Sequence, residues 1–174
     1  MSNGSIVDEV QSILEKRARL LAQVPETADE DAVSIDLAVV TVGDERYGID
    51  VGFLREVRPA TAVTPVPSLP PIWAGLINLR GNLCPVLDLA RYLGVPKSEL
   101  NDRTEVVVVE GVELTAGLLV DAVEGIQRYL VADIGRPLAN SSGVIRGITP
   151  DFASVVDMSE LLADPNLVVN DEIL

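Results

Sequence analysis

The chain has 174 residues, of which 48% are apolar and 23% charged, with 13 basic and 27 acidic side chains. No histidine is present, which excludes mechanisms that rely on a histidine base and metal sites ligated by histidine. A single cysteine, Cys84, excludes an internal disulfide and a zinc site built from cysteines alone. Valine (26 residues) outnumbers leucine (22), and this excess of β-branched side chains favours strands.

The net charge of −14 disfavours binding to nucleic acid on electrostatic grounds, because contacts to phosphate require lysine and arginine. Most of this charge, −9, lies in residues 101–174, whereas residues 36–100 carry only −1. The longest aliphatic run is Val106–Val109, far shorter than the roughly 20 residues of a membrane-spanning helix. No apolar segment typical of a signal peptide follows Met1–Gly4. We therefore expect a cytoplasmic protein with no direct membrane insertion.

An amphipathic helix is predicted for Ser5–Val24, with Ser5 as its cap and Pro25 as its stop. Its apolar residues recur at intervals of three and four, and they include Ile6, Val10, Ile13, Leu14 and Leu21. Such a helix either packs back on its own domain or docks to another protein, and the first case is the commoner one. An acidic linker, Glu26–Asp31, follows it.

From Asp36 onward, short apolar runs are separated by turn residues, which predicts strands. The expected strands are Leu37–Val42, Arg46–Val51, Gly75–Leu79, Leu83–Leu87, Thr104–Val109, Leu114–Val120, Ile145–Ile148 and Ala153–Val156. Short helices are expected at Asp88–Leu93 and Met158–Leu162, with Asp88 and Asp157 as their caps. Many short strands with few helices indicate small barrels or a sandwich.

The sequence contains an internal echo at a spacing of 69 residues. This shift superimposes Gly48, Ile49, Val51 and Leu54 on Gly117, Leu118, Val120 and Val123. Self-similarity of this kind predicts two related β units rather than one large sheet.

Catalytic chemistry would have to be built from carboxylates, and the candidates are Asp50, Asp88, Asp121 and Asp157. Each of them also occupies a turn or cap position, which is the commoner reason for an aspartate there. No glycine-rich phosphate loop occurs, and we expect neither a metal nor a cofactor. Cys84 lies in an apolar strand, where a buried and inert thiol is expected. A carboxylate-based hydrolase remains as a remote alternative.

The segment from Gly75 to Leu89 reads Gly-Leu-Ile-Asn-Leu-Arg-Gly, then Asn-Leu-Cys-Pro-Val-Leu-Asp-Leu. It predicts a hairpin in which Gly81 takes a positive φ and Arg80 reaches solvent or a partner. This segment resembles the Gly-x-x-Asn-x-Arg-Gly…Pro-x-x-Asp-Leu signature of the CheW family, the adaptors of bacterial and archaeal chemosensory arrays. The block Gly43–Ile49 with Glu56-Val57, and the block Gly117–Val123, are similar to the family in order and spacing.

The resemblance implies a mostly β fold of two five-stranded, SH3-like barrel subdomains, here with an added N-terminal helix and a short C-terminal helix. It implies an adaptor without enzymatic activity that couples the cytoplasmic tips of methyl-accepting chemoreceptors to the regulatory domain of the histidine kinase CheA. The protein would then be recruited to membrane-associated receptor arrays. Carried over residue by residue, the receptor-binding groove comprises Leu54, Glu56, Val57, Arg80, Gly81, Glu105, Gly117 and Ile126.

These observations predict an N-terminal helix and linker in residues 1–35, a CheW-like domain in residues 36–164 that divides near 100–104, and a tail in residues 165–174. Residues 1–35 have no counterpart in the shortest family members. A specialised chemosensory pathway, such as type IV pilus motility or second-messenger control, is therefore an alternative. In that alternative the N-terminal helix binds a further partner or mediates self-association.

Overall fold

The computed structural model describes residues 8–14, 32–97, 99–112 and 114–167. The described part contains ten strands: β1 (Ser34–Val42), β2 (Glu45–Asp50), β3 (Leu54–Pro59), β4 (Trp73–Leu79), β5 (Asn82–Asp88), β6 (Glu105–Glu110), β7 (Thr115–Val120), β8 (Ala122–Leu130), β9 (Ile145–Ile148) and β10 (Ser154–Val156). The helices are residues 8–14, α2 (Leu89–Leu93) and α3 (Met158–Leu162), with 3₁₀ turns at Val51–Phe53, Ala60–Ala62, Val131–Asp133 and Pro165–Leu167.

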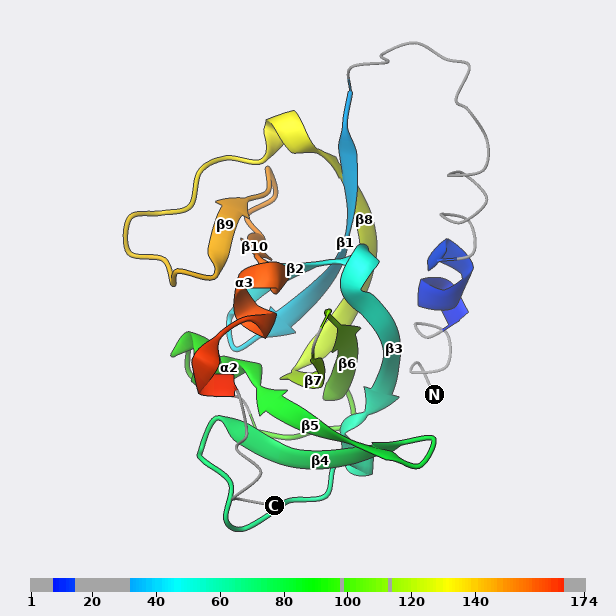
Figure 1. Ribbon diagram of the computed structural model, residues 1–174. Coiled ribbons are helices and arrows are strands. Elements are labelled where there is room, and N and C mark those ends of the chain that lie inside the picture. Colours follow the sequence, from blue (N-terminus) through cyan, green and yellow to red (C-terminus); the bar gives the residue numbers. More distant parts are fainter. Residues whose placement is uncertain (1–7, 15–31, 98, 113, 168–174) are drawn as a thin grey trace.

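The strands form two five-stranded sheets, as expected. Sheet A has the order β8-β1-β2-β10-β9, and sheet B has the order β3-β6-β7-β5-β4 (Figure 1). In each sheet one parallel pair, β2 with β10 or β5 with β7, joins antiparallel hairpins. In each sheet an isolated bridge links the segment after one edge strand to the strand at the opposite edge. These bridges join Thr64 to Leu76 in sheet B and Gly135 to Ile148 in sheet A. Each sheet thereby curls into a small barrel, which confirms the SH3-like fold class.

The echo at 69 residues is a real structural repeat. Adding or subtracting five in the strand numbering converts the order of sheet A into that of sheet B. The equivalence extends to the caps: Asp88 and Asp157 share the same backbone conformation and accept a hydrogen bond from the residue three positions on. It also extends to the bulges, because Arg55 in β3 and Glu124 in β8 are the extra residues at equivalent positions. The chain thus encodes one β unit twice.

The division expected near residues 100–104 is wrong, because β6 and β7 belong to the same sheet as β3, β4 and β5. The chain passes from sheet A to sheet B after β2 and returns after β7, so sheet B is inserted into sheet A. The first unit supplies β1 and β2 to sheet A and β3–β5 to sheet B, and the second unit supplies the reverse. This exchange of strands ties the two barrels together.

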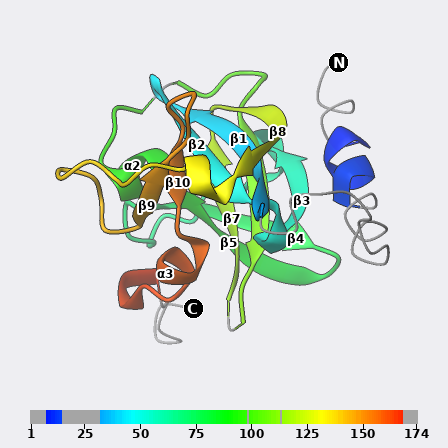
Figure 2. The ribbon, with the colours of Figure 1, turned by 90° about the horizontal axis from the view of Figure 1, so that it is seen from above.

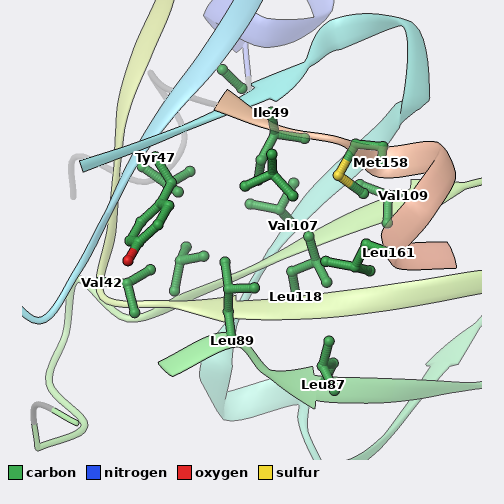
Figure 3. Close-up of a cluster of buried hydrophobic side chains, with 14 of the residues drawn as sticks. Val42, Tyr47, Ile49, Leu87, Leu89, Val107, Val109, Leu118, Met158 and Leu161 are labelled. Carbon is green, nitrogen blue, oxygen red and sulfur yellow. The ribbon is translucent and has the colours of Figure 1, made fainter. Parts of the chain in front are cut away.

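A shared hydrophobic core lies between the two sheets (Figure 3). It includes side chains from both sheets and from α3, among them Ile49, Val107, Leu118, Met158 and Leu161. The opposite faces carry smaller clusters, one around Val106 and Val108 in sheet B and one around Leu37 and Val39 in sheet A. The run Val106–Val109 alternates between the shared core and the cluster of sheet B. Both faces of the strand are therefore buried, which explains the aliphatic excess of the chain.

Two further expectations need correction. Strand β8 was not among the strands predicted from the sequence, because Glu124, Gln127 and Arg128 interrupt the apolar pattern. These residues are tolerated because β8 is an edge strand with exposed positions.

The tail predicted to begin at residue 165 is also wrong at its start, because the 3₁₀ turn Pro165–Leu167 buries Leu167 in the shared core. The remainder of that tail, residues 168–174, lies outside the described residues.

The described part of the N-terminal helix, residues 8–14, packs on the domain. Val10 is 2% exposed and belongs to the shared core, and Leu14 packs against that core. Ile13 is half-buried. Ile6 and Leu21 lie outside the described residues. Within the described part of the chain, no helix is long and apolar enough to cross a bilayer.

Candidate functional site

The structure places the predicted groove residues in three locations. Leu54, Glu56 and Val57 lie on β3, and Ile126 lies on β8. Glu105 and Gly117 lie inside sheet B, on β6 and β7. Arg80 and Gly81 form the turn between β4 and β5. The structure therefore divides these residues between two edge strands, the interior of sheet B and one hairpin tip.

Strands β3 and β8 are edge strands of different sheets and are equivalent in the repeat. Leu54 and Val57 of β3 and Val123 of β8 belong to the shared core, and Ile126 packs against it. Glu56 is half-buried and its Oε2 lies 3.3 Å from Nε of Arg58. We call the surface formed by Leu54, Glu56, Val57 and Ile126 the edge surface. It is mostly aliphatic, with one carboxylate already paired within its own strand.

Glu105 lies in β6, next to the edge strand β3. It is paired with Pro59 of β3 on one side and with Val120 of β7 on the other. The side chain is 2% exposed, and among the described residues its Oε2 has no hydrogen-bond partner. Burial raises the pKa of this carboxyl above its ordinary value of 4.5, and a hydrogen bond from the backbone N–H of Val123 partly opposes the shift. Since Val123 belongs to β8, this carboxyl links sheet B to the edge strand of sheet A.

Gly117 is a packing position. A Cβ atom placed there would lie 2.6 Å from Cγ1 of Val106 and 3.2 Å from Cγ2 of Val86. Both distances are shorter than van der Waals contact, so only glycine lets the neighbouring side chains close over β7. Gly117 therefore shapes sheet B from within and is not itself exposed.

The hairpin tip has the geometry expected from the sequence. Gly81 has φ 92° and no described atom near the position of a Cβ, and Arg80 also adopts a left-handed conformation with φ 52°. The carboxamide oxygen of Asn78 accepts a hydrogen bond of 2.8 Å from the N–H of Gly81 and holds the turn. Arg80 is exposed. Figures 1 and 2 show the tip on the side of the molecule where β3 and the helix 8–14 lie.

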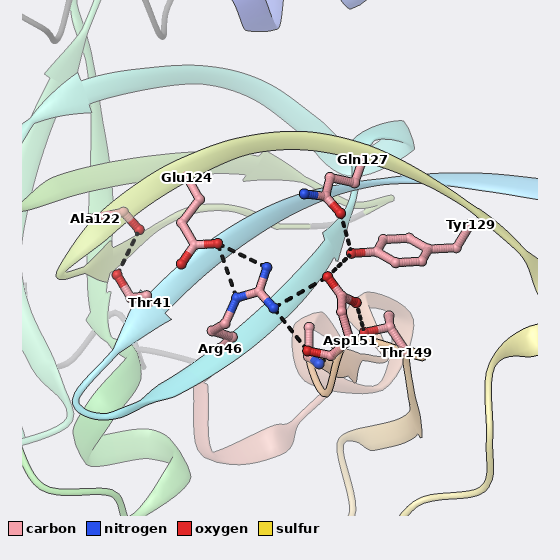
Figure 4. A network of polar contacts seen from close by, with 9 residues as sticks. Thr41, Arg46, Ala122, Glu124, Gln127, Tyr129, Thr149 and Asp151 are labelled. Atoms are coloured by element: carbon pink, nitrogen blue, oxygen red, sulfur yellow. Dashed lines mark hydrogen bonds and ion pairs between the residues drawn. The ribbon is translucent and has the colours of Figure 1, made fainter.

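A polar network on sheet A was not anticipated from the sequence (Figure 4). Arg46 of β2 lies 3.0 Å from Oε2 of Glu124 in β8 and 3.3 Å from Oδ2 of Asp151, which precedes β10. Asp151 also accepts hydrogen bonds from Thr149 and from Tyr129. Burial opposes ionisation of Asp151, but these donors hold its pKa below the ordinary value. The network joins β2, β8 and the loop before β10, which are distant in the sequence.

Three of the four strand-end aspartates, Asp50, Asp88 and Asp157, have the local turn and cap roles predicted for them, whereas Asp121 bonds to the β1–β2 turn 78 positions away. Asp50 accepts from the N–H of Gly52, Asp88 from Arg91, Asp121 from Gly43 and Asp157 from Glu160. Asp88 is also paired with Lys97 at 2.7 Å. Cys84 is buried as expected, and burial raises the pKa of its thiol to about 11.

Among the hollows on the described surface, three have linings that differ from the edge surface. One of about 560 Å³ lies beside Arg46, Leu138 and Phe152. Another, of about 270 Å³, lies beside Trp73 and Leu100, and a third, of about 240 Å³, lies between Phe53 and Leu162. Among the described residues that line these hollows, none belongs to the predicted groove.

Comparison with known proteins identifies the family. A family model described as the CheW-like domain matches residues 36–166, which contain both sheets. The chain belongs to the CheW family. The expected boundaries of that domain, 36–164, differ from the match by two residues at one end.

Individual relatives agree with this family. "Chemotaxis protein CheW" of Rhizobium meliloti (strain 1021) is 34% identical over 124 residues, which cover 71% of this chain and 72% of that protein. "Protein FrzA" of Myxococcus xanthus is 38% identical over 96 residues, and the match covers 55% of this chain and 60% of that protein. The crystal structure of scaffolding protein TtCheW from Thermoanaerobacter tengcongensis superimposes with a TM-score of 0.70 at 26% identity, covering 79% of this chain and 99% of that one.

These relatives place the chain among the scaffold proteins of chemotaxis-type signal transduction. The matched region begins at residue 36, so the helix 8–14 lies outside the family domain. Its position on the domain is therefore a feature that the family match does not explain.

Proposed function

We propose that this CheW-family chain is a non-catalytic adaptor that couples methyl-accepting chemoreceptors to a CheA-type histidine kinase. In this proposal one barrel binds the regulatory domain of the kinase, and the edge surface receives the helical hairpin at the receptor tip. The protein acts in the cytoplasm and joins receptor arrays through these partners. The single observation that carries the proposal is the family match over both barrels.

The chemistry of the edge surface suits a helical partner. Leu54 and Val57 are buried, at 7% and 5% exposure, and Ile126 is half-buried, so an amphipathic helix would bury its apolar stripe against these side chains only where they are uncovered. Arg80 projects from a tip that two left-handed residues hold, and it makes no hydrogen bond or ion pair within the described part of the chain. Its guanidinium is thus free to bind a carboxylate or carbonyl of the partner and to fix the register of the contact.

The specialised pathway with an additional partner on the N-terminal helix receives less support. Val10 and Leu14, the apolar residues that such a partner would contact, already pack on the domain. The hydrolase alternative loses its best candidates, since the four aspartates serve as cap and turn acceptors.

Binding measurements with purified partners test the proposal. The full chain is titrated by calorimetry with a receptor-tip hairpin and, separately, with the kinase regulatory domain. We expect Arg80→Glu to weaken receptor-tip binding about tenfold, equivalent to about 1.4 kcal/mol, without changing the melting temperature. Arg136→Glu, at an exposed position in the loop between β8 and β9, is the matched control and leaves binding unchanged. Failure of the unmodified chain to bind either partner would refute the proposal.

A further inference from the structure

The helix 8–14 presents its apolar residues to the domain and its polar residues to solvent. Val10 is 2% exposed, and Ile13 and Leu14 are half-buried, whereas Asp8, Glu9, Gln11 and Ser12 are exposed. Positions 10, 13 and 14 have the spacing by which a helix inserts one stripe into a groove. The segment is therefore seated on the domain by the same type of contact that a helical partner would use.

The location of this contact is given by its neighbours. Val10 belongs to the same buried cluster as Leu54 and Val57 of β3, and Ile126 of β8 packs against that cluster. Oε1 of Glu9 lies 3.7 Å from the position of a Cβ on Gly125, which precedes Ile126 in β8. Figures 1 and 2 both show the helix beside β3. The helix thus lies beside β3 and close to Gly125 of β8.

We propose that residues 8–14 occupy the edge surface in cis and compete with the helical partner that binds there. The proposal rests on the proposed function, because the edge surface is also the site suggested for the receptor tip. Residues 15–31 connect the helix to β1, so the helix remains attached to the domain at a high effective concentration. A receptor tip binds only the fraction of molecules whose edge surface is uncovered, and its apparent affinity falls by that fraction.

Because residues 8–14 compete with the receptor tip, a segment outside the family domain regulates receptor binding. An adaptor whose edge surface is covered stays unbound at low receptor density and engages where many receptor tips raise the local concentration. A change that lifts the helix, such as modification or capture of residues 8–14, would increase receptor binding without altering the two barrels. The apolar residue Val10 and the exposed residue Gln11 are neighbours on this helix, and they allow the proposal to be tested with matched substitutions.

The test compares Val10→Asp with Gln11→Asp in the full chain. Each substitution introduces one carboxylate into the same turn, but only position 10 faces the core. Two readouts are taken: the exposure of the methyl groups of Leu54, Val57 and Ile126 to a soluble paramagnetic agent by NMR, and the affinity for a receptor-tip hairpin. We expect Val10→Asp to expose these methyl groups and to tighten binding about tenfold, while Gln11→Asp changes neither.

Unchanged methyl exposure in Val10→Asp would overturn the proposal, because the helix would then not cover the edge surface. Exposed methyl groups with equal or weaker receptor binding would overturn the competition. If no variant binds the receptor tip while the methyl groups become exposed, the proposed function fails and the covering of the edge surface stands. Leu14→Asp, at a half-buried position, opens the same face at a smaller cost in stability and decides the matter if Val10→Asp does not fold.

Discussion

Replacement of Glu105 by glutamine tests how the junction between the sheets is built. The carboxyl of Glu105 is 2% exposed and accepts a hydrogen bond from the N–H of Val123, and in the described part of the chain its Oε2 has no partner. Glutamine keeps an acceptor for Val123 and nearly the same volume, but it cannot ionise. We predict that Glu105→Gln increases the free energy of unfolding at pH 8.

The magnitude follows from the cost of burying a polar group without a partner. That cost is about 1–3 kcal/mol, and it rises when the group is charged. Glutamine removes the charge but leaves a neutral, unpartnered amide in its place, so the gain at pH 8 is the difference between a charged and a neutral buried group, on the order of 1 kcal/mol. For a chain of this size such a gain corresponds to a rise in Tm of roughly 2–4 °C.

The effect depends on pH with a definite sign. Burial raises the pKa of Glu105 in the folded state above its ordinary value of 4.5, so folding favours the protonated form. The contribution of the carboxyl to stability is complete below its unfolded pKa and is lost as the pH rises through its folded pKa. The advantage of Glu105→Gln is therefore largest at pH 8 and becomes smaller at pH 5.

Urea unfolding followed by the fluorescence of Trp73, the only tryptophan and a buried one, measures this difference at pH 5 and pH 8. Glu99→Gln, at an exposed position, removes one carboxylate from the surface and is the matched control, with a small effect at both pH values. An equal gain at both pH values, or no gain at pH 8, would show that a buried charge at Glu105 does not destabilise the folded chain.

Two further substitutions probe the backbone. Gly117→Ala places a Cβ 2.6 Å from Cγ1 of Val106, and we expect it to lower the free energy of unfolding by about 1–3 kcal/mol. Urea unfolding measures this loss. Gly143→Ala is the control, because no described atom lies near its Cβ, and it should leave the free energy of unfolding almost unchanged. Phe152 is 83% exposed and has a φ of 68°, a left-handed conformation that is strained for a residue with a side chain. We therefore expect Phe152→Gly to stabilise the chain by about 1 kcal/mol, measured in a thermal melt. Leu138→Gly is the control, because Leu138 is exposed without a positive φ, and it should not stabilise the chain.

Local signals in the sequence were sufficient for the elements whose chemistry is local. The caps Asp88 and Asp157 act through residues three positions away, and the turn at Arg80 and Gly81 depends on its own backbone. The echo at 69 residues predicted two related units because each unit must form the same strands and bulges.

Features that depend on long-range pairing could not be predicted in this way. The exchange of strands between the units assigns β3 and β8 to sheets that local patterns do not indicate, so the division near 100–104 was misplaced. Arg46 binds Glu124 and Asp151, which are 78 and 105 positions away, and no local pattern joins them. The amphipathic pattern of residues 8–14 predicted a buried face, but only the fold shows that this face packs against the shared core.

The most direct test of the account is whether one molecule of this chain binds both partners at once. The chain, a receptor-tip hairpin and the regulatory domain of the kinase are mixed, and the mass of the eluting complex is measured by size-exclusion chromatography with light scattering. We expect a ternary complex that forms only when the chain is present. Absence of any complex that contains the chain, with both partners folded and in excess, would contradict it.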